Sequence, residues 1–389
     1  MVAAVRRGRS MRWVGRRFGV APGTVQFWVR RAAGERLDRV DFADRPAGCR
    51  RPANRTAGET EDLVLSLRRE LRDVSVLGEC GAVAIRAELL ARGVGEPPSV
   101  RTIGRILERR GALDANHRVR RPPPPAGWYL PQVAAANAEL DSFDAVEGLV
   151  IRGGTDVEVF NGISLHGGLV LSVPTRGVTA AGAVKMLIEH WRKFGLPGFA
   201  QFDNDTRFQG AHQWPDSFGR VTRLCLQLGV VPVFAPPREP GFQAGIENYN
   251  GRWQAKVWSR FEHESPADLR RRSNRYTAAL RERAAARIES APPRRPFPAG
   301  WTLDLRRPLA GKVFFIRRTD AQGRAQVLGR MFVVERNWVH RLVRCEFDLD
   351  RGVARFFALR RRDPIAQPLL IEHPYAPPKR RFLGVISDS

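Results

Sequence analysis

The sequence predicts a multidomain protein with an α-helical N-terminal part built of helix-turn-helix units, a central α/β domain and a small all-β barrel near the C-terminus. The chain has 389 residues, whereas single hydrophobic cores rarely grow beyond roughly 250 residues. Helical periodicity in the first third gives way to short β-rich runs, and proline-rich segments separate the parts. The predicted parts are residues 1–45, 59–113, 131–262 and 299–373, with a basic helical linker at 263–298.

The charge is unevenly distributed along the chain. The net charge is +25, and arginine outnumbers lysine 60 to 5. The excess is +12 in residues 1–130 and +11 in 291–389, but +2 in 131–290. A GC-rich genome could produce an arginine bias by itself, but such a bias would not spare the middle of the chain. Two basic flanks around a nearly neutral centre therefore indicate a polyanionic partner such as double-stranded DNA.

Cysteine spacing and hydropathy limit the classes of protein to which this chain can belong. The four cysteines are scattered without C-x-x-C spacing, which argues against a disulfide framework and against a zinc site. No apolar run approaches the roughly 18 residues of a membrane span, and no apolar signal region follows the arginine-rich N-terminus. We therefore expect a cytoplasmic, nucleoid-associated protein with no membrane partner.

Residues 10–33 have the pattern of a helix-turn-helix. Ser10 is a cap for a first helix, Gly19 provides the turn, and Pro22 lies near the start of a second helix. The second helix of such a unit enters the major groove of DNA, so its polar side chains are candidates for base and phosphate contacts. These candidates are Thr24, Gln26, Arg30 and Arg31. A purely structural helical hairpin is the alternative interpretation.

Residues 59–113 repeat this pattern with three helices. Leucine and isoleucine recur at helical spacing, Ser99 precedes the third helix, and Gly93 and Gly111 mark a turn and a stop. The third helix carries polar residues away from its apolar stripe, as a recognition helix would. Its candidate DNA contacts are Arg101, Thr102 and Arg105. A proline-rich spacer that includes Pro122–Pro125 follows.

The middle of the chain predicts a mixed sheet with helices on both faces. The expected order is three strands, a helix, a strand, a helix, a strand and a helix. The predicted ranges are strands at 140–145, 157–165, 168–173, 199–202 and 230–234, and helices at 179–194, 217–228 and 243–261.

Three acids on different elements of this domain are candidate metal ligands. Asp203 follows a short apolar strand, Asp141 interrupts another strand, and Glu247 lies on the last helix. Carboxylates from separate elements can hold two divalent cations. Taken alone, Asp203 could be a turn or cap residue and Asp141 a salt-bridged acid. Asp144 points to the opposite face of its strand and is the second choice for Asp141.

The C-terminal part predicts five short strands, at 313–316, 325–328, 331–334, 342–347 and 353–359. Arginines lie between them, and a tail follows from Pro374. Short strands in this arrangement are typical of a small barrel. Such a barrel could contact DNA, serve oligomerisation, or do both.

The set Asp141, Asp203-Asn204 and Glu247-Asn248-Tyr249-Asn250, in this order of elements, resembles the catalytic core of bacterial insertion-sequence transposases and retroviral integrases. These proteins form the DDE group of the ribonuclease-H-like fold. The resemblance covers residues 131 to about 262. It is looser for the helix-turn-helix region, and the terminal barrel resembles the one that follows the core in Mu-type transposases.

The resemblance implies a polynucleotidyl transferase in which Asp141, Asp203 and Glu247 bind two Mg²⁺ ions, for which Mn²⁺ could substitute. Water first cuts DNA at the element's ends, and the freed 3′-hydroxyl then attacks target DNA. The protein would act as a homo-oligomer on transposon-end and target DNA. Within the core, the expected DNA contacts are Asn204, Asn250, Arg252 and Lys256.

The chain departs from the family pattern at several positions. Asp205 replaces the usual glycine after Asp203-Asn204, and we expect it to adopt the same turn because aspartate tolerates unusual backbone angles. Gln243-Ala244 replaces an Asn-Gly pair, and Gln254 stands where many members carry a basic residue, so Arg252 or Lys256 is expected to take its place. Two other classes of function stay open: a catalytically inactive, domesticated DNA-binding regulator, and a nuclease of the same fold that does not join strands.

Overall fold

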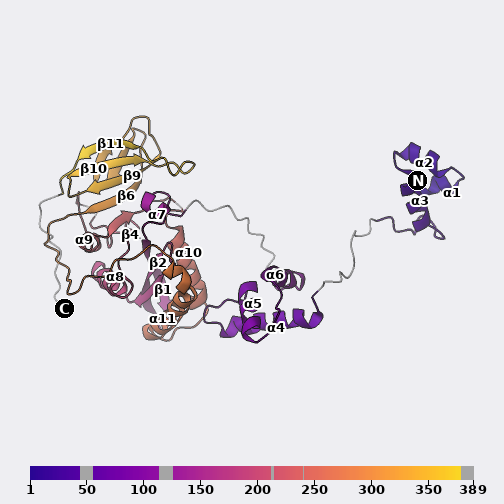
Figure 1. Ribbon diagram of the computed structural model, residues 1–389, viewed down its shortest axis with the longest axis horizontal. Coiled ribbons are helices and arrows are strands. Elements are labelled where there is room, and N and C mark those ends of the chain that lie inside the picture. Colours follow the sequence, from indigo (N-terminus) through magenta and orange to yellow (C-terminus); the bar gives the residue numbers. More distant parts are fainter. Residues whose placement is uncertain (44–55, 114–125, 212–213, 240, 378–389) are drawn as a thin grey trace. The chain divides into compact units, whose positions relative to one another are not determined.

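The computed structural model describes residues 1–43, 56–113, 126–211, 214–239 and 241–377. The chain divides into two compact units, residues 1–61 and 62–389, and each is described by itself. Most of the stretch between the first two predicted parts, 1–45 and 59–113, and the proline-rich spacer at Pro122–Pro125 lie outside the described residues (Figure 1). No helix among the described residues is both long and apolar enough to span a membrane.

The first unit contains the two predicted helices and a short helix before them. They are α1 (Val2–Arg6), α2 (Met11–Phe18) and α3 (Pro22–Arg31). The side chain of Ser10 accepts a hydrogen bond from the backbone N–H of Trp13, and Gly19 ends α2 with a φ of 65°, as the sequence predicted. Val14 and Val25 are fully buried between the helices. A DNA-reading role for these helices stays a prediction.

Three helices precede the central domain: α4 (Gly58–Val74), α5 (Ala82–Ala91) and α6 (Val100–Arg109). Their buried side chains form one cluster that includes Leu67, Leu89 and Ile106. Ser99 caps α6 by accepting a hydrogen bond from the N–H of Thr102 at 3.1 Å. The predicted helices of residues 59–113 are confirmed.

The second unit is built on one nine-stranded sheet of order β11-β10-β9-β6-β5-β4-β1-β2-β3. β1, β2 and β3 form an antiparallel meander, and β4 and β5 run parallel to β1. The predicted mixed sheet and the predicted order of its first five strands are therefore confirmed. These strands are β1 (Leu140–Ile151), β2 (Thr155–Ser164), β3 (Val170–Thr175), β4 (Phe199–Phe202) and β5 (Val231–Phe234).

Helices cover both faces of this sheet because its strands are apolar on both sides. On one face, α8 (Ala180–Phe194) and α9 (Arg220–Gln227) pack on Phe143, Phe160 and Phe202. On the other face, α10 (Ala244–Trp253), the π-helix η1 (Gln254–Trp258) and α11 (Pro266–Arg283) pack on Val146 and Val159 (Figure 1). The short helices α7 (Pro131–Ala134) and α12 (Ala285–Glu289) flank the domain.

The C-terminal strands do not form a separate barrel, which corrects the prediction. β6 (Lys312–Arg318) pairs in parallel with β5, so the central sheet continues into β9 (Leu342–Asp348), β10 (Val353–Ala358) and β11 (Leu369–Pro374). The hairpin of β7 (Arg324–Val327) and β8 (Arg330–Val333) packs on these strands through Phe332, which contacts Phe347 and Phe356. β11 lies beyond the predicted strands.

The predicted linker 263–298 is not an exposed connection. α11 buries Leu269 and Tyr276 against the face of the sheet that carries α10. After α12, the chain returns across the domain, where Arg295 exchanges backbone hydrogen bonds with Leu196. The side chain of Arg295 also donates to the carbonyl oxygens of Leu228 and Gly229. This segment is therefore packed along the central domain.

Candidate active site

β1 carries two aspartates that point to opposite faces of the sheet, because strand side chains alternate. Asp141 lies on the face covered by α8, and Asp144 lies on the face covered by α10. In the antiparallel pairing with β2, Asp144 stands opposite Asn161. Which of the two aspartates can join the other candidate acids therefore depends on the face on which those acids lie.

Asp141 does not join the other predicted acids, so that prediction is wrong. The residue is 1% exposed, and its carboxylate forms a bidentate ion pair with Arg294, with N–O distances of 2.8 and 2.6 Å. Trp191 donates its indole N–H to the same carboxylate at 3.2 Å. A carboxylate neutralised by a fork of two N–H groups and an indole is a structural group. The salt-bridged alternative weighed for Asp141 is thus the one observed.

Asp144, rather than Asp141, lies near Asp203. In the parallel pairing of β1 with β4, Ser142 stands beside Gln201, and two further residues along this register Asp144 comes beside Asp203. Burial and repulsion by the Asp203 carboxylate raise the pKa of Asp144 to about 6, and Glu247 contributes to the rise. Burial also raises the pKa of Asp203.

Glu247, the third candidate acid, is more exposed than Asp144 and Asp203. Glu247 lies exposed in the first turn of α10. Among the described residues, no three acidic, histidine or cysteine side chains lie close enough together to enclose a metal ion. The structure therefore brings Asp144 and Asp203 together and leaves Glu247 at the edge of their site.

A chain of hydrogen-bonded polar side chains holds Asp144 on the α10 face of the sheet. Asn250 of α10 donates its amide N–H to Asp144 at 2.7 Å and accepts from the amide of Asn161 at 2.8 Å. Asn161 in turn accepts from Ser172 at 2.6 Å, and Ser172 contacts the hydroxyl of Tyr249 at 2.6 Å. The predicted DNA contact Asn250 is therefore engaged with the protein, where its bond to the carboxylate favours the ionised form.

The loop after Asp203 is built by side chains rather than by unusual backbone angles. The N–H of Asp205 bonds the carboxylate of Asp203 at 3.1 Å, and among the described residues Asp205 is not one of those with a positive φ. Its own carboxylate binds Arg207 at 2.9 and 2.7 Å. Arg207 also bonds Glu147 and Glu158. The loop at Asp205 therefore forms without a glycine-like backbone angle at that residue.

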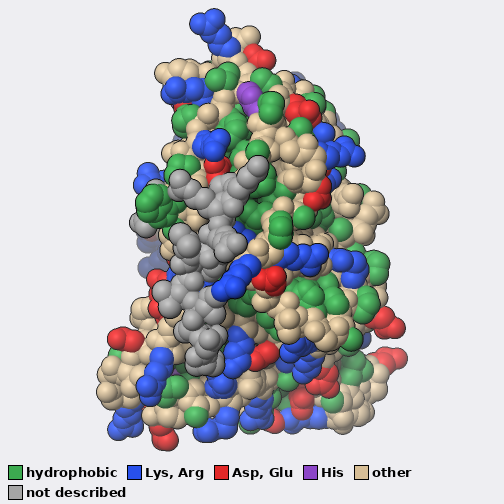
Figure 2. Space-filling model, turned by 90° about the vertical axis from the view of Figure 1, so that its left-hand side faces the viewer, with side chains coloured by type: hydrophobic (Ala, Val, Ile, Leu, Met, Phe, Trp, Pro, Cys, Tyr) green, Lys and Arg blue, Asp and Glu red, His purple; other side chains and the backbone are tan. Residues whose placement is uncertain are grey.

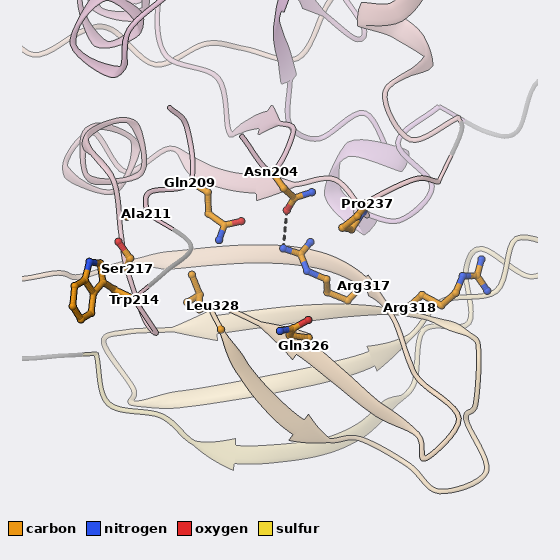
Figure 3. A pocket seen from close by; sticks show the side chains of 11 residues that line it. Asn204, Gln209, Ala211, Trp214, Ser217, Pro237, Arg317, Arg318, Gln326 and Leu328 are labelled. Atoms are coloured by element: carbon orange, nitrogen blue, oxygen red, sulfur yellow. Dashed lines mark hydrogen bonds between the residues drawn. The ribbon is translucent and has the colours of Figure 1, made fainter. Parts of the chain in front are cut away.

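Asn204 is another predicted DNA contact that the protein engages itself. Its Oδ1 accepts from Arg317 of β6 at 2.7 Å, and its Nδ2 donates to the carbonyl of Ala235 at 2.6 Å (Figure 3). The first of these contacts joins the Asp203 loop to the C-terminal strands. Sequence reasoning missed Arg317 and Arg294, since their partners lie far away along the chain.

The other predicted contacts on the core differ in accessibility. Arg252 is exposed on α10 and lies over the Tyr249 ring. Lys256 donates to the carbonyl of Gly78 at 2.8 Å, so its ammonium group holds the segment before α5. Arg252 is thus the more accessible of the two.

The predicted contacts on the N-terminal helices are mostly open to solvent. The exposed ones are Thr24, Gln26, Arg30, Arg101 and Arg105. Arg31 is instead held within its unit, where it donates to the carbonyl of Ala43 at 2.8 Å and lies over Trp28. The hydroxyl of Thr102 is bonded to Ser99 at 2.9 Å. On the face shown in Figure 2, basic side chains spread over the whole surface, with acidic side chains among them.

No protein-family profile and no curated protein sequence matches this chain. Among solved structures, a chain of the simian T-cell lymphotropic virus intasome in complex with PP2A regulatory subunit B56 gamma is similar at 14% identity and a TM-score of 0.33, over 81% of this chain and 99% of that one. The catalytic core domain of BIV integrase is similar at 16% identity and a TM-score of 0.28, over 37% of this chain and 83% of that one. Since TM-scores this low do not establish a shared fold, the interpretation of the site has to rest on its own geometry.

Proposed function

We propose that this protein is a DNA-cleaving and DNA-joining enzyme of the DDE type, with Asp144, Asp203 and Glu247 as its acidic triad. The observation that supports it best is the pair Asp144 and Asp203, two partly buried carboxylates at neighbouring strands: burial raises the pKa of both, and the Asp203 carboxylate raises that of Asp144 further. Acids arranged in this way are typical of functional sites, because an uncompensated pair is unfavourable in a folded protein.

The donor set fits a hard divalent cation such as Mg²⁺. All candidate ligands are carboxylate oxygens, which Mg²⁺ prefers, and a cation would remove the repulsion that raises the pKa of Asp144. Asp144 and Asp203 would hold the metal, and Glu247 would complete the site from α10. When bound, two Mg²⁺ or Mn²⁺ ions would activate the attacking oxygen and stabilise the leaving oxygen.

Other side chains prepare the two aspartates for this role. Asn250 holds Asp144 by a bond that favours the ionised carboxylate. Arg207 lies between Asp205, Glu147 and Glu158, so it neutralises the acids that surround Asp203 without pairing with Asp203 itself. These contacts favour the ionised form of Asp144 and reduce the charge repulsion around Asp203, against the rise in pKa that burial causes.

The DNA partner follows from the charge distribution and the N-terminal helices. The basic flanks carry +12 and +11, and exposed polar residues lie on α3 and α6. We infer that these helices bind the ends of a mobile element, that Arg252 contacts DNA near the acids, and that several copies of the chain assemble on the DNA.

A strand-transfer assay tests this proposal. The full-length protein is incubated with Mg²⁺, an oligonucleotide that carries the element's end with a free 3′-hydroxyl, and a target plasmid. Joined product in the wild type, and none in Asp144→Asn, supports the proposal. Nicking without joining would favour a nuclease of this fold, and DNA binding without either reaction would favour a regulator.

A further inference from the structure

Arg317 is a buried cation that meets only neutral partners. It is 8% exposed, and among the residues that the structure describes no carboxylate forms an ion pair with it. Its guanidinium donates to the carbonyls of Ile316 at 2.8 Å and Ala235 at 3.3 Å, and to Asn204 at 2.7 Å. These bonds use three of its five N–H groups. A buried charge of this kind is unfavourable unless an anion comes close to it.

The guanidinium lines a pocket of about 400 Å³ that lies between the Asp203 loop and the β7–β8 hairpin (Figure 3). Its polar lining includes the side chains of Gln209, Gln326 and Ser217. The neighbouring Arg318 also lines the pocket, but its guanidinium pairs with Glu239. Of the two arginines among the described lining residues, Arg317 is therefore the one whose guanidinium has no acidic partner.

The volume and the donors indicate the kind of ligand. A pocket of about 400 Å³ is near the lower end of the range for small-molecule sites. A guanidinium and side-chain amides match a phosphate group, which accepts several hydrogen bonds at once. Burial lowers the pKa of Arg317 to about 10, so the side chain is still charged at neutral pH.

The position of the pocket connects it with the candidate active site. Asn204 lines the pocket and directly follows Asp203 in the chain. A DNA strand that places one phosphodiester at Asp144 and Asp203 carries further phosphates on either side of it. One of these neighbouring phosphates can then meet Arg317.

We propose that this pocket binds one backbone phosphate of the DNA strand, next to the phosphodiester at Asp144 and Asp203, with Arg317 as its counter-charge. The amides of Gln209 and Gln326 donate further hydrogen bonds to the same phosphate. This inference rests on the proposed function for the identity of the strand. It adds a phosphate site formed by the C-terminal strands, outside the acidic triad.

The test is DNA affinity as a function of salt, measured by fluorescence anisotropy with a labelled oligonucleotide. The full-length Asp203→Asn protein serves as background, so that chemistry does not interfere. Arg317→Gln should lower the slope of log K against log salt by about one and the affinity about tenfold, whereas Arg317→Lys should keep the slope. Because Gln326 is exposed, Gln326→Glu neutralises the pocket without altering the core and should have the same effect as Arg317→Gln.

The control is Arg223→Gln, which removes a buried arginine of α9 that donates to carbonyl oxygens outside this pocket. It should leave the salt slope unchanged. Unchanged slopes in both Arg317→Gln and Gln326→Glu would overturn the inference.

Calorimetry with the dinucleotide pTpT separates this inference from the proposed function. Binding of pTpT to the background protein and its loss in Arg317→Gln support the phosphate site, even if the wild type joins no strands. Strand joining by a wild type whose salt slope does not depend on Arg317 leaves the proposed function standing and rejects the site.

Discussion

The two faces of β1 place similar carboxylates in opposite electrostatic environments. On the α8 face, Asp141 is fully buried and paired with Arg294 and Trp191. On the α10 face, Asp144 is partly buried, meets the amide of Asn250 and lies near two further acids. The first carboxylate is neutralised by the protein, and the second is left in need of a cation. The fold thus gives Asp144 like charges where it gives Asp141 a counter-charge, and this difference is why we propose Asp144 as the metal ligand.

The comparison predicts its largest effect for Asp144→Asn. Loss of one of the proposed metal-binding carboxylates should lower the rate of strand cleavage about a thousandfold or more, since a bound metal contributes several kcal/mol to catalysis. The rate is measured with Mg²⁺ on a labelled oligonucleotide. Asp203→Asn should match this loss. Near wild-type cleavage by Asp144→Asn would place the chemistry elsewhere.

The opposite face should respond in stability instead. Asp141→Asn leaves Arg294 buried without a counter-charge, so the free energy of unfolding should fall by about 3 kcal/mol. Urea unfolding of the wild type and the variant measures this difference. The double variant Asp141→Leu with Arg294→Met should recover most of the loss, because it removes both charges. A loss below about 0.5 kcal/mol in the single variant, as for an exposed ion pair, would show that the ion pair of Asp141 with Arg294 does not stabilise the fold as a buried pair.

The pH dependence of stability should distinguish the two acids as well. The pKa of Asp144 is raised to about 6, so the folded state favours the protonated form. The stability that protonation contributes is full below the ordinary pKa near 4 and is lost as the pH rises through 6. Wild type should therefore lose about 2 kcal/mol relative to Asp144→Asn between pH 4 and pH 7, after allowance for partial exposure.

Thermal unfolding across this pH range, with and without Mg²⁺, measures the effect. At pH 7.5 Mg²⁺ should raise the melting temperature of the wild type and leave that of Asp144→Asn unchanged. An equal response to Mg²⁺ in both proteins would separate Asp144 from metal binding.

The smallest predicted effect concerns the residue that holds Asp144. Asn250→Ala removes a hydrogen bond to the ionised carboxylate, so the pKa of Asp144 should rise above about 6. Cleavage at neutral pH should fall about tenfold, and the midpoint of the pH–rate profile should move upward. Asn248→Ala, at an exposed position on the same helix, is the matched control. A lower rate with an unmoved midpoint would assign Asn250 a purely structural part.

Much of the central domain was predictable because its elements depend on local patterns. The order of strands and helices from residue 140 to residue 253 follows from apolar runs and from the glycine and proline residues between them. The position of Asp203 at the end of β4 follows in the same way. Helix caps such as Ser99 could also be predicted from the sequence, since they bond backbone groups three residues away.

The choice between Asp141 and Asp144 could not be made from the sequence. It depends on Arg294, which lies 153 residues from Asp141, and on the register of β1 with β4. Both aspartates fit the same strand pattern, and only long-range pairing decides which one is neutralised.

The predicted barrel failed for a similar reason. A short strand has the same sequence pattern whether it closes a small barrel or extends a neighbouring sheet. The pairing of Phe314 with Val233 decides between these outcomes, and no local signal specifies it. The same pairing places Arg317 beside Asn204, which is why that contact was also missed.

We propose that the metal site lies on the Asp144 face of β1. Anomalous diffraction from crystals of the protein soaked in Mn²⁺ tests it most directly. We expect a Mn²⁺ peak bound by carboxylate oxygens of Asp144 and Asp203, which disappears in Asp144→Asn. A peak beside Asp141, or one that persists at full occupancy in Asp144→Asn, would contradict it.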